Sequence, residues 1–197
     1  MGERGQANDK LLESRRMNST ALQIPTLATE RLKLEPLSLL HSSGMFDMWR
    51  HSAVQEYSGI AEDKDRREIN MPAKTREDSD RLIGFWLKAA QDGWGFRWAI
   101  ILAKEEAFVG HIGFNSLSTC AEIAYHLNPE YWGKGFMTEA ANAAIEWRRD
   151  NGATEIEAFI DPENAGSIAL ALRLGMNETA VFSEGAQRYQ IFTAEQR

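Results

Sequence analysis

Two glycines and a lysine, Gly133-Lys134-Gly135, stand between an apolar strand pattern and a long helical pattern. The first turn of a helix carries unpaired backbone N–H groups and the positive end of the helix dipole. Glycine lets such a backbone approach a bulky anion closely, so this arrangement suits a phosphate or pyrophosphate group. Two glycines also serve ordinary tight turns, and the loop by itself leaves that interpretation open.

Two common phosphate motifs do not match this loop. A P-loop requires Gly-x-x-x-x-Gly-Lys-Ser/Thr, which residues 133–140 do not supply. A dinucleotide-binding fingerprint requires a third glycine three residues after the second, and the chain has Thr138 there. The loop is therefore not predicted to bind a nucleotide in either of these two ways.

Three blocks of the chain resemble the Gcn5-related N-acetyltransferase family, and most closely its branch that acetylates the N-termini of ribosomal proteins and related amines. The blocks cover 27–37, 121–140 and 161–176, in the order and separation that the family shows. In this family, backbone amides of the glycine loop hold the pyrophosphate of coenzyme A. The resemblance therefore implies a pyrophosphate cradle made of Gly133, Lys134, Gly135, Phe136, Met137 and Thr138.

The resemblance also implies which residues meet the rest of acetyl-coenzyme A. The family's strand before the loop splays from its neighbour, so the backbone of Tyr125, His126 and Leu127 would bind the pantetheine arm, with an ordinary paired strand as the alternative. The Leu127 amide is a candidate donor to the oxyanion of the tetrahedral intermediate. Asn164 would contact the pantetheine amides, cap a helix, or do both, and Ser167 would hydrogen-bond or protonate the leaving thiolate.

Glu122 is the first candidate for the general base. It shares the strand parity of Ala124 and His126, so in the cleft it would take a proton from the acceptor ammonium, directly or through water. A solvated or salt-bridged carboxylate is the alternative interpretation. His126 is the second candidate, because the reference pKa of histidine is about 6.5.

Two positions depart from the family pattern. Many relatives carry a tyrosine as the general acid four residues after the Ser167 position, but this chain has Ala171, which leaves Ser167 or water as the proton source. Met137 is larger than the glycine or alanine that usually ends the loop signature, and its bulk could tighten the pyrophosphate turn. A module that binds acyl-coenzyme A without turnover is therefore kept as an alternative function.

The predicted activity is direct transfer of an acetyl group to a primary amine, within a ternary complex. The acceptor is a protein N-terminal amine or a small amine such as an antibiotic, a polyamine or an amino-acid derivative. Residues 51–74 form a long connection, which in compact domains is more often functional than idle, and we expect them to decide this choice. Four aromatic residues could line the acceptor pocket, with a place in the core favoured for each: Trp49, Tyr57, Trp94 and Tyr189.

The element order predicted around these residues is β–α–α–β–β–β–α–β–α–β–β, a mixed α/β arrangement. It agrees with the fold that the resemblance implies, a mostly antiparallel central sheet with splayed central strands and flanking helices. Strands are predicted over 27–37, 96–104, 107–117, 121–127, 154–160, 177–183 and 187–193. Helices are predicted over 38–50 and 75–91, from the glycine loop to about residue 150, and between Asn164 and Gly175.

The composition is that of a soluble globular protein, with 197 residues, 43% hydrophobic and 26% charged. It predicts one domain over 21–197 after a mobile polar arm over 1–20, with a start at Met17 left open. The net charge of −7 argues against a nucleic-acid partner. One cysteine, no membrane-length apolar run and no signal-peptide pattern indicate a cytoplasmic protein. No metal-ligand spacing is found, and a homodimer is left open.

Overall fold

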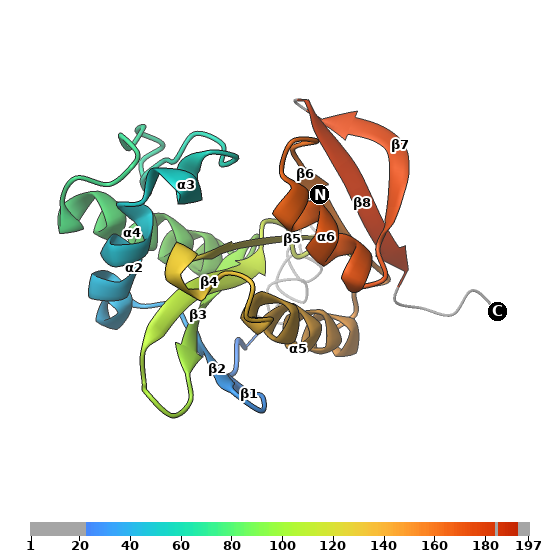
Figure 1. Cartoon of the computed structure of the whole chain (residues 1–197), viewed down its shortest axis with the longest axis horizontal. Coiled ribbons are helices and arrows are strands. Elements are labelled where there is room, and N and C mark those ends of the chain that lie inside the picture. Colours follow the sequence, from blue (N-terminus) through green and yellow to red (C-terminus); the bar gives the residue numbers. More distant parts are fainter. Residues whose placement is uncertain (1–22, 184, 193–197) are drawn as a thin grey trace, which may run out of the picture.

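The structure is a computed structural model that describes residues 23–183 and 185–192 (Figure 1). The strands are β1 (Leu27–Ala28), β2 (Leu32–Pro36), β3 (Phe96–Leu102), β4 (Phe108–Phe114), β5 (Cys120–Leu127), β6 (Glu155–Ile160), β7 (Asn177–Ser183) and β8 (Ala186–Phe192). The helices are η1 (Leu39–His41), α2 (Ser42–Trp49), α3 (Ser52–Gln55), α4 (Arg76–Asp92), η2 (Pro129–Tyr131), α5 (Phe136–Asp150) and α6 (Ala165–Arg173). The predicted arm over 1–20 lies outside the described residues.

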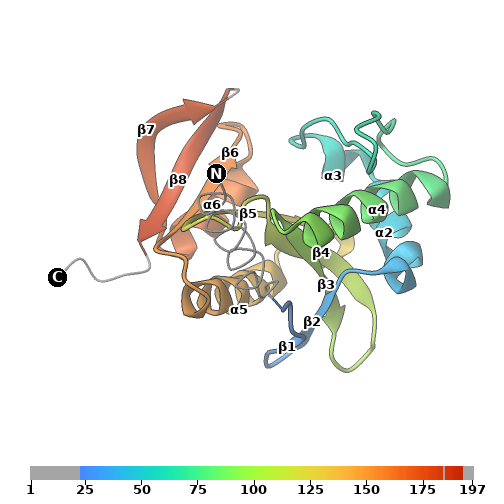
Figure 2. The same ribbon diagram turned by 180° about the vertical axis from the view of Figure 1, so that it is seen from behind.

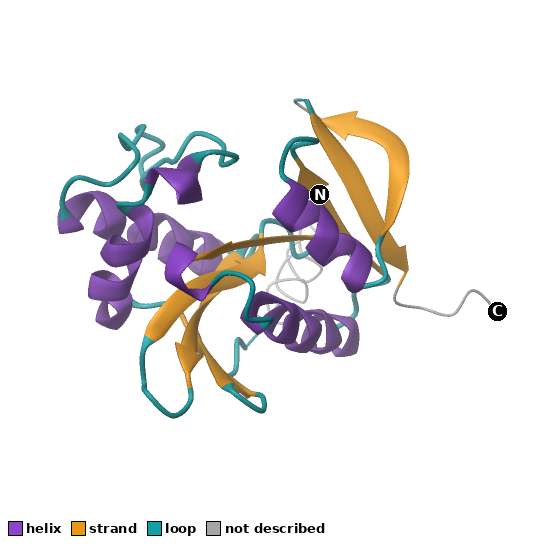
Figure 3. Cartoon of the chain, in the orientation of Figure 1, coloured by secondary structure: helices purple, strands orange, loops and turns teal. Residues whose placement is uncertain are grey.

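The strands form one sheet in the order β1-β2-β3-β4-β5-β6-β8-β7. Neighbouring strands are antiparallel except β5 and β6, which run parallel and pair only from Cys120 to Glu122 on β5. Beyond Glu122 the two strands diverge, and Figure 3 shows β6, β7 and β8 standing apart from the other strands. The predicted mixed α/β fold with splayed central strands is therefore confirmed.

The two faces of the sheet carry separate hydrophobic cores. Alternation along β3 directs Trp98 and Ile100 into the core shared with α5, and directs Ala99 and Ile101 into the core shared with α2 and α4. In Figure 2 the helix α4 crosses the sheet on the side of β3 and β4, while α5 lies below β5. Side chains of alternating parity on β5 therefore face either α5 and α6 or the helices α2, α3 and α4.

The predicted single strand over 27–37 is wrong in its middle. The chain reverses at Thr29–Arg31, so Leu27 pairs with Leu34 and two short strands form a hairpin. The turn is closed because the amide of Thr29 donates to the carbonyl of Leu32 at 2.9 Å and the amide of Leu32 donates to the Thr29 hydroxyl at 3.1 Å. The apolar alternation predicted the strand but not this turn, since Thr29 has no glycine or proline beside it to mark it.

The helices begin and end where capping residues predict. Thr75 and Asp78 form a capping box at the start of α4, and Gly93 ends that helix with a φ of +78°. The predicted helix over 38–50 divides into η1, which Ser38 caps, and α2. No helix in the described part of the chain is long and apolar enough to cross a membrane.

Candidate active site

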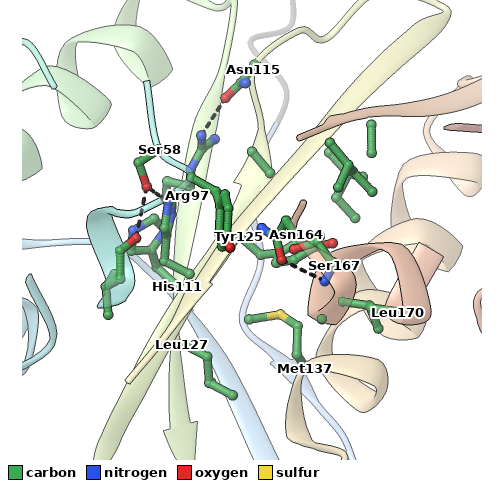
Figure 4. Close-up of a pocket in the computed structure, with 18 of the residues that line it drawn as sticks. Ser58, Arg97, His111, Asn115, Tyr125, Leu127, Met137, Asn164, Ser167 and Leu170 are labelled. Atoms are coloured by element: carbon green, nitrogen blue, oxygen red, sulfur yellow. Dashed lines mark hydrogen bonds between the residues drawn. The ribbon is translucent and has the colours of Figure 1, made fainter. Parts of the chain in front are cut away.

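A cavity of about 1410 Å³ extends across β5 at the level where β5 and β6 diverge. One end lies against the glycine loop, α5 and α6, and the other end lies under α3, α4 and the segment that joins them. Figure 4 shows Tyr125, Met137, Asn164 and Ser167 on one side of the cavity and Arg97 with its neighbours on the other. Most of the residues predicted for the coenzyme line the first end, but Lys134 does not line the cavity, and His126 lies with Glu122 at the second end.

The glycine loop presents backbone at the start of α5. Gly133 and Gly135 have φ values of +72° and +77°, which is the left-handed region that favours glycine. Gly135 is the N-cap of α5, and no side chain caps the first turn of that helix. No capping side chain therefore competes with an anion at this turn, and pyrophosphate binding by Gly133 to Thr138 stays a prediction. The side chain of Met137 is 8% exposed and packs in the α5 core, so its bulk is accommodated there.

A clamp that the sequence did not predict holds this loop. Arg31 donates to the carbonyl of Lys134 at 3.0 Å and to the carboxylate of Glu139, on the first turn of α5, at 2.6 Å. Its guanidinium lies 4.6 Å from the centre of the Phe136 ring. Burial opposes the charge of Glu139, but hydrogen bonds from Thr29 and Arg31 keep its pKa below the usual value. Nothing in residue spacing links Arg31 to a helix more than a hundred positions later.

The register of β5 decides which backbone groups face the cavity. The amide of Asn115 donates to the carbonyl of Glu122, and the amide of Asn128 donates to the carbonyl of Val109, both at 2.8 Å. Main-chain groups of an antiparallel strand alternate in direction, so those of Tyr125 and Leu127 point away from β4, to the side that β6 has left. The indole of Trp132 donates to the Leu127 carbonyl at 2.7 Å.

The main chain of His126 does not face the side that β6 has left. The same alternation directs its main chain toward β4, so it is removed from the predicted pantetheine contacts. Its ring nitrogen Nε2 lies 2.8 Å from the Ser58 hydroxyl, and the ring centre lies 4.6 Å from that of Trp49. Burial and the charge of Arg97 lower the pKa of His126 to about 3. A group that weakly basic is a poor proton acceptor, which disfavours the predicted second base.

At the start of α6, Asn164 and Ser167 stand together. The Asn164 side chain accepts a hydrogen bond from the Ser167 amide at 3.0 Å, so Asn164 is a helix cap as well as a lining residue. Ala171 is buried in the α5 core. The phenol of Tyr125 nevertheless makes a hydrogen bond with Ser167. Burial raises the pKa of this phenol, and the hydrogen bond with Ser167 opposes that shift. The alternation along the strand placed Tyr125 on this side of β5 but did not reveal that its phenol meets Ser167.

Glu122 is the end of a short polar chain on the other face of the sheet. Asn115 donates to its carboxylate at 2.6 Å and accepts from the Arg97 guanidinium at 2.5 Å. Arg97 is 4% exposed, and its guanidinium carbon lies 3.4 Å from the centre of the Trp86 ring. Burial lowers the pKa of Arg97 to about 9, against the opposing effect of Glu122, so the side chain stays largely charged near pH 7.

The four aromatic residues considered for an acceptor pocket divide in the structure. Trp49, Tyr57 and Trp94 line the cavity, although Trp49 also belongs to the core under α2 and α4. Tyr189 is buried in the core under α5 and does not line the cavity.

Comparison with known proteins agrees with this geometry. Residues 31–177 match the model of the acetyltransferase (GNAT) domain. The N-acetyltransferase p20 of Bacillus licheniformis, which is uncharacterised, is 29% identical over 167 residues, or 83% of this chain and 85% of that protein. The ribosomal L7/L12 alpha-N-protein acetyltransferase RimL, solved with coenzyme A, superposes with a TM-score of 0.70 at 16% identity, over 85% of this chain and 98% of its own.

The microcin C7 self-immunity acetyltransferase MccE, solved with acetyl-coenzyme A and AMP, superposes with a TM-score of 0.68 at 19% identity. The superposition covers 83% of this chain and 93% of that one. Both solved structures share the fold, and the family match extends from the β1–β2 turn through the glycine loop to the start of β7. The chain therefore belongs to the Gcn5-related N-acetyltransferase (GNAT) family and is an N-acetyltransferase that uses acetyl-coenzyme A.

Proposed function

We propose that this protein transfers the acetyl group of acetyl-coenzyme A directly to a primary amine, and that the two substrates meet where β5 leaves β6. The cavity that crosses β5 carries the proposal, because it joins the open start of α5 to the carboxylate of Glu122. Holding both reactants in one cavity supplies much of the catalysis through proximity.

In this proposal the coenzyme occupies the cavity between β5, α5 and α6. The backbone of Gly133 to Thr138 binds the pyrophosphate, and the main chain of Tyr125 and Leu127 binds the pantetheine arm as a sheet edge would. Asn164 lies near the end of that arm, where its amide could bond the pantetheine. These placements leave the thioester close to Ser167 and to the divergence of the strands.

The chemistry needs one proton removed and one supplied. Glu122 takes the proton of the acceptor ammonium, directly or through water, and the neutral amine attacks the thioester carbonyl. A C–N bond forms, the Leu127 amide stabilises the oxyanion, and the C–S bond then breaks. Ser167 or Tyr125 donates the proton that converts the leaving thiolate to a thiol. Tyr125 suits this role because its raised pKa keeps the phenol protonated at neutral pH.

The acceptor is a protein N-terminal amine or a small amine. RimL, which is named as an acetyltransferase of a ribosomal-protein N-terminus, supports the first class through its similar fold, and MccE, solved with AMP, supports the second. We place the reaction in the cytoplasm, and a homodimer is compatible with it.

Calorimetric titration with acetyl-coenzyme A is the test, with adenosine 3′,5′-bisphosphate as the control that lacks the pantetheine arm. We expect micromolar binding that requires the full coenzyme, and release of free thiol when an amine is added. Gly135→Trp should abolish binding, because a large side chain would fill the pyrophosphate turn at a φ of +77°. Absence of binding would overturn the proposal, whereas binding without thiol release from any amine would indicate a binding module.

A further inference from the structure

Three aromatic side chains form a wall at the acceptor end of the cavity. Phe85 and Trp86 extend from α4, and Trp94 follows the glycine that ends this helix. The ring centres lie 4.8 Å apart for Phe85 and Trp86, 5.6 Å for Phe85 and Trp94, and 6.0 Å for the two tryptophans. All three are half-buried, and neither Phe85 nor Trp94 belongs to the two hydrophobic cores. Core packing therefore does not account for two of these rings, and a flat ligand would.

Arg97 connects the aromatic wall to the proposed base. One face of its guanidinium lies on Trp86, and one edge donates to Asn115, which in turn donates to Glu122. Only a guanidinium and an amide separate the wall from the carboxylate. An acceptor whose amine reaches Glu122 therefore places the atoms a few bonds further on against the wall.

A second arginine covers the wall from the solvent side. The guanidinium carbon of Arg66 lies 5.3 Å from the ring centre of Phe85 and 5.8 Å from that of Trp94. Arg66 is exposed, has a φ of +62°, and pairs with Glu62 at 2.9 Å. Its position above two rings gives the wall a cationic cover on the solvent side.

The turn that carries Arg66 is fixed by Asp63, which is 6% exposed. The carboxylate accepts hydrogen bonds from the amides of Arg67 and Asp65 and from the guanidinium of Arg81, at 2.9 to 3.0 Å. These bonds, that from Arg67 first, lower the pKa of Asp63 to about 2. The Asp63 carboxylate therefore stays charged at neutral pH and holds the turn that carries Arg66. This gives part of the long connection between α3 and α4 a structural role.

The charges around the wall favour an uncharged ring. Arg66 is paired with Glu62, and Arg97 is joined through Asn115 to Glu122, so each cation at this end has a carboxylate near it. A third carboxylate, Glu56, also lines the cavity here. An anionic group on the acceptor would be repelled by these carboxylates, which already offset the charges of both arginines. An ammonium group would be attracted to them.

We propose that the acceptor is a primary amine that carries an uncharged aromatic ring a few bonds from the nitrogen, with the ring bound at the wall of Phe85, Trp86 and Trp94. This inference rests on the proposed acetyl transfer and names the class of its acceptor. Two kinds of acceptor carry such an amine: a small arylalkylamine, or a peptide whose N-terminal residue is aromatic.

The test compares acceptors that match in size and differ in the ring. Coenzyme A release would be measured with 2-phenylethylamine and 2-cyclohexylethylamine, and with peptides that begin with phenylalanine or with cyclohexylalanine. Aromatic contacts of this kind predict a kcat/KM about 3- to 10-fold higher for the aromatic member of the preferred pair. The pair that shows the difference identifies the source, because the small amine and the peptide are assayed separately.

Variants then assign the effect to the wall. Phe85→Leu and Trp94→Leu should reduce the aromatic preference to about 1, since both keep apolar bulk and lose the flat ring. Leu87→Ala is the matched control, because Leu87 is a 40% exposed apolar side chain on the same helix outside the cavity. Titration with acetyl-coenzyme A checks that each variant is folded, and its affinity should not change.

The outcomes separate this inference from the proposed function. Equal kcat/KM for both members of each pair, or equal loss with every amine in the wall variants, would overturn the aromatic acceptor. Turnover of a polyamine without turnover of any aromatic amine would also overturn it and leave acetyl transfer intact. The absence of thiol release with every amine tested, or no binding of acetyl-coenzyme A, would instead contradict the proposed function.

Discussion

Glu122 owes its proposed role to neighbours outside its own strand. Alternation along the strand predicted its face of the sheet, but Arg97 comes from β3 and Asn115 directly follows β4. Within the Arg97–Asn115–Glu122 chain, Asn115 donates to one carboxylate oxygen of Glu122, Oε1, and not to the other. A carboxylate held in this way is oriented toward a substrate proton rather than free to rotate.

Replacement of this carboxylate tests the base directly. Glu122→Gln keeps the shape and the link to Asn115 but cannot accept a proton, so kcat should fall about 100-fold or more. Asn115→Leu should lower kcat roughly 10-fold by releasing Glu122. Steady-state kinetics should show both losses in kcat, with the KM for acetyl-coenzyme A unchanged.

Glu146→Gln is the control for this prediction, because Glu146 is an exposed carboxylate on α5 outside the cavity. Unchanged kcat in Glu122→Gln would show that another group, or water alone, takes the proton.

His126 shows why a candidate base cannot be chosen by residue type. From sequence, its reference pKa suited proton transfer at neutral pH. In the structure the ring is packed against Trp49 and His111, and burial makes the charged form costly. The ring is covered by Trp49, at the end of α2, and by Ser58, which follows α3, and no local pattern predicts such long-range contacts.

At the scale of elements, the features set by local chemistry could be predicted. Glycine positions marked the start of α5 and the end of α4, and Asn164 marked the start of α6. The hairpin of β1 and β2 was missed, since its turn depends on a Thr29 hydroxyl that also donates to Glu139 at 2.6 Å. The helix ends that border the coenzyme half of the candidate site were therefore predicted, while the Arg31 clamp, the aromatic wall and the position of the Tyr125 phenol needed the tertiary structure.

The clamp between the hairpin and α5 predicts an effect on coenzyme affinity. Arg31→Ala removes the bonds to Lys134 and Glu139, so the glycine loop loses its support and the dissociation constant of acetyl-coenzyme A should rise about 3- to 10-fold. At saturating coenzyme, kcat should stay near the wild-type value, because Arg31 is remote from the thioester.

Lys33→Ala is the control for the clamp, since Lys33 is a partly exposed cation on β2 that pairs with Glu106 at 3.9 Å outside the cavity. Calorimetry distinguishes the two variants. An affinity in Arg31→Ala equal to that of Lys33→Ala would mean that the loop keeps its conformation without the clamp.

At the scale of the molecule, the two parts of the sheet are joined only by the short pairing between β5 and β6. Three residue pairs connect β5 to β6, whereas β4 and β5 pair over five. The cavity opens where this connection stops, and residues from both parts of the sheet line it. Bound coenzyme would therefore contact α5 and β5 on one side and α6 on the other, and add contacts across the weakest junction of the sheet.

This junction predicts that acetyl-coenzyme A stabilises the whole fold. A ligand at 100 times its dissociation constant raises the free energy of unfolding by about 2.7 kcal/mol. For a chain of 197 residues, each kcal/mol corresponds to roughly 2–4 °C, so the melting temperature should rise by roughly 5–10 °C. Adenosine 3′,5′-bisphosphate at the same concentration lacks the arm that reaches β5 and α6, and should raise it less. Thermal unfolding followed by calorimetry would measure both, and equal shifts would show that the pantetheine arm does not bind across the junction.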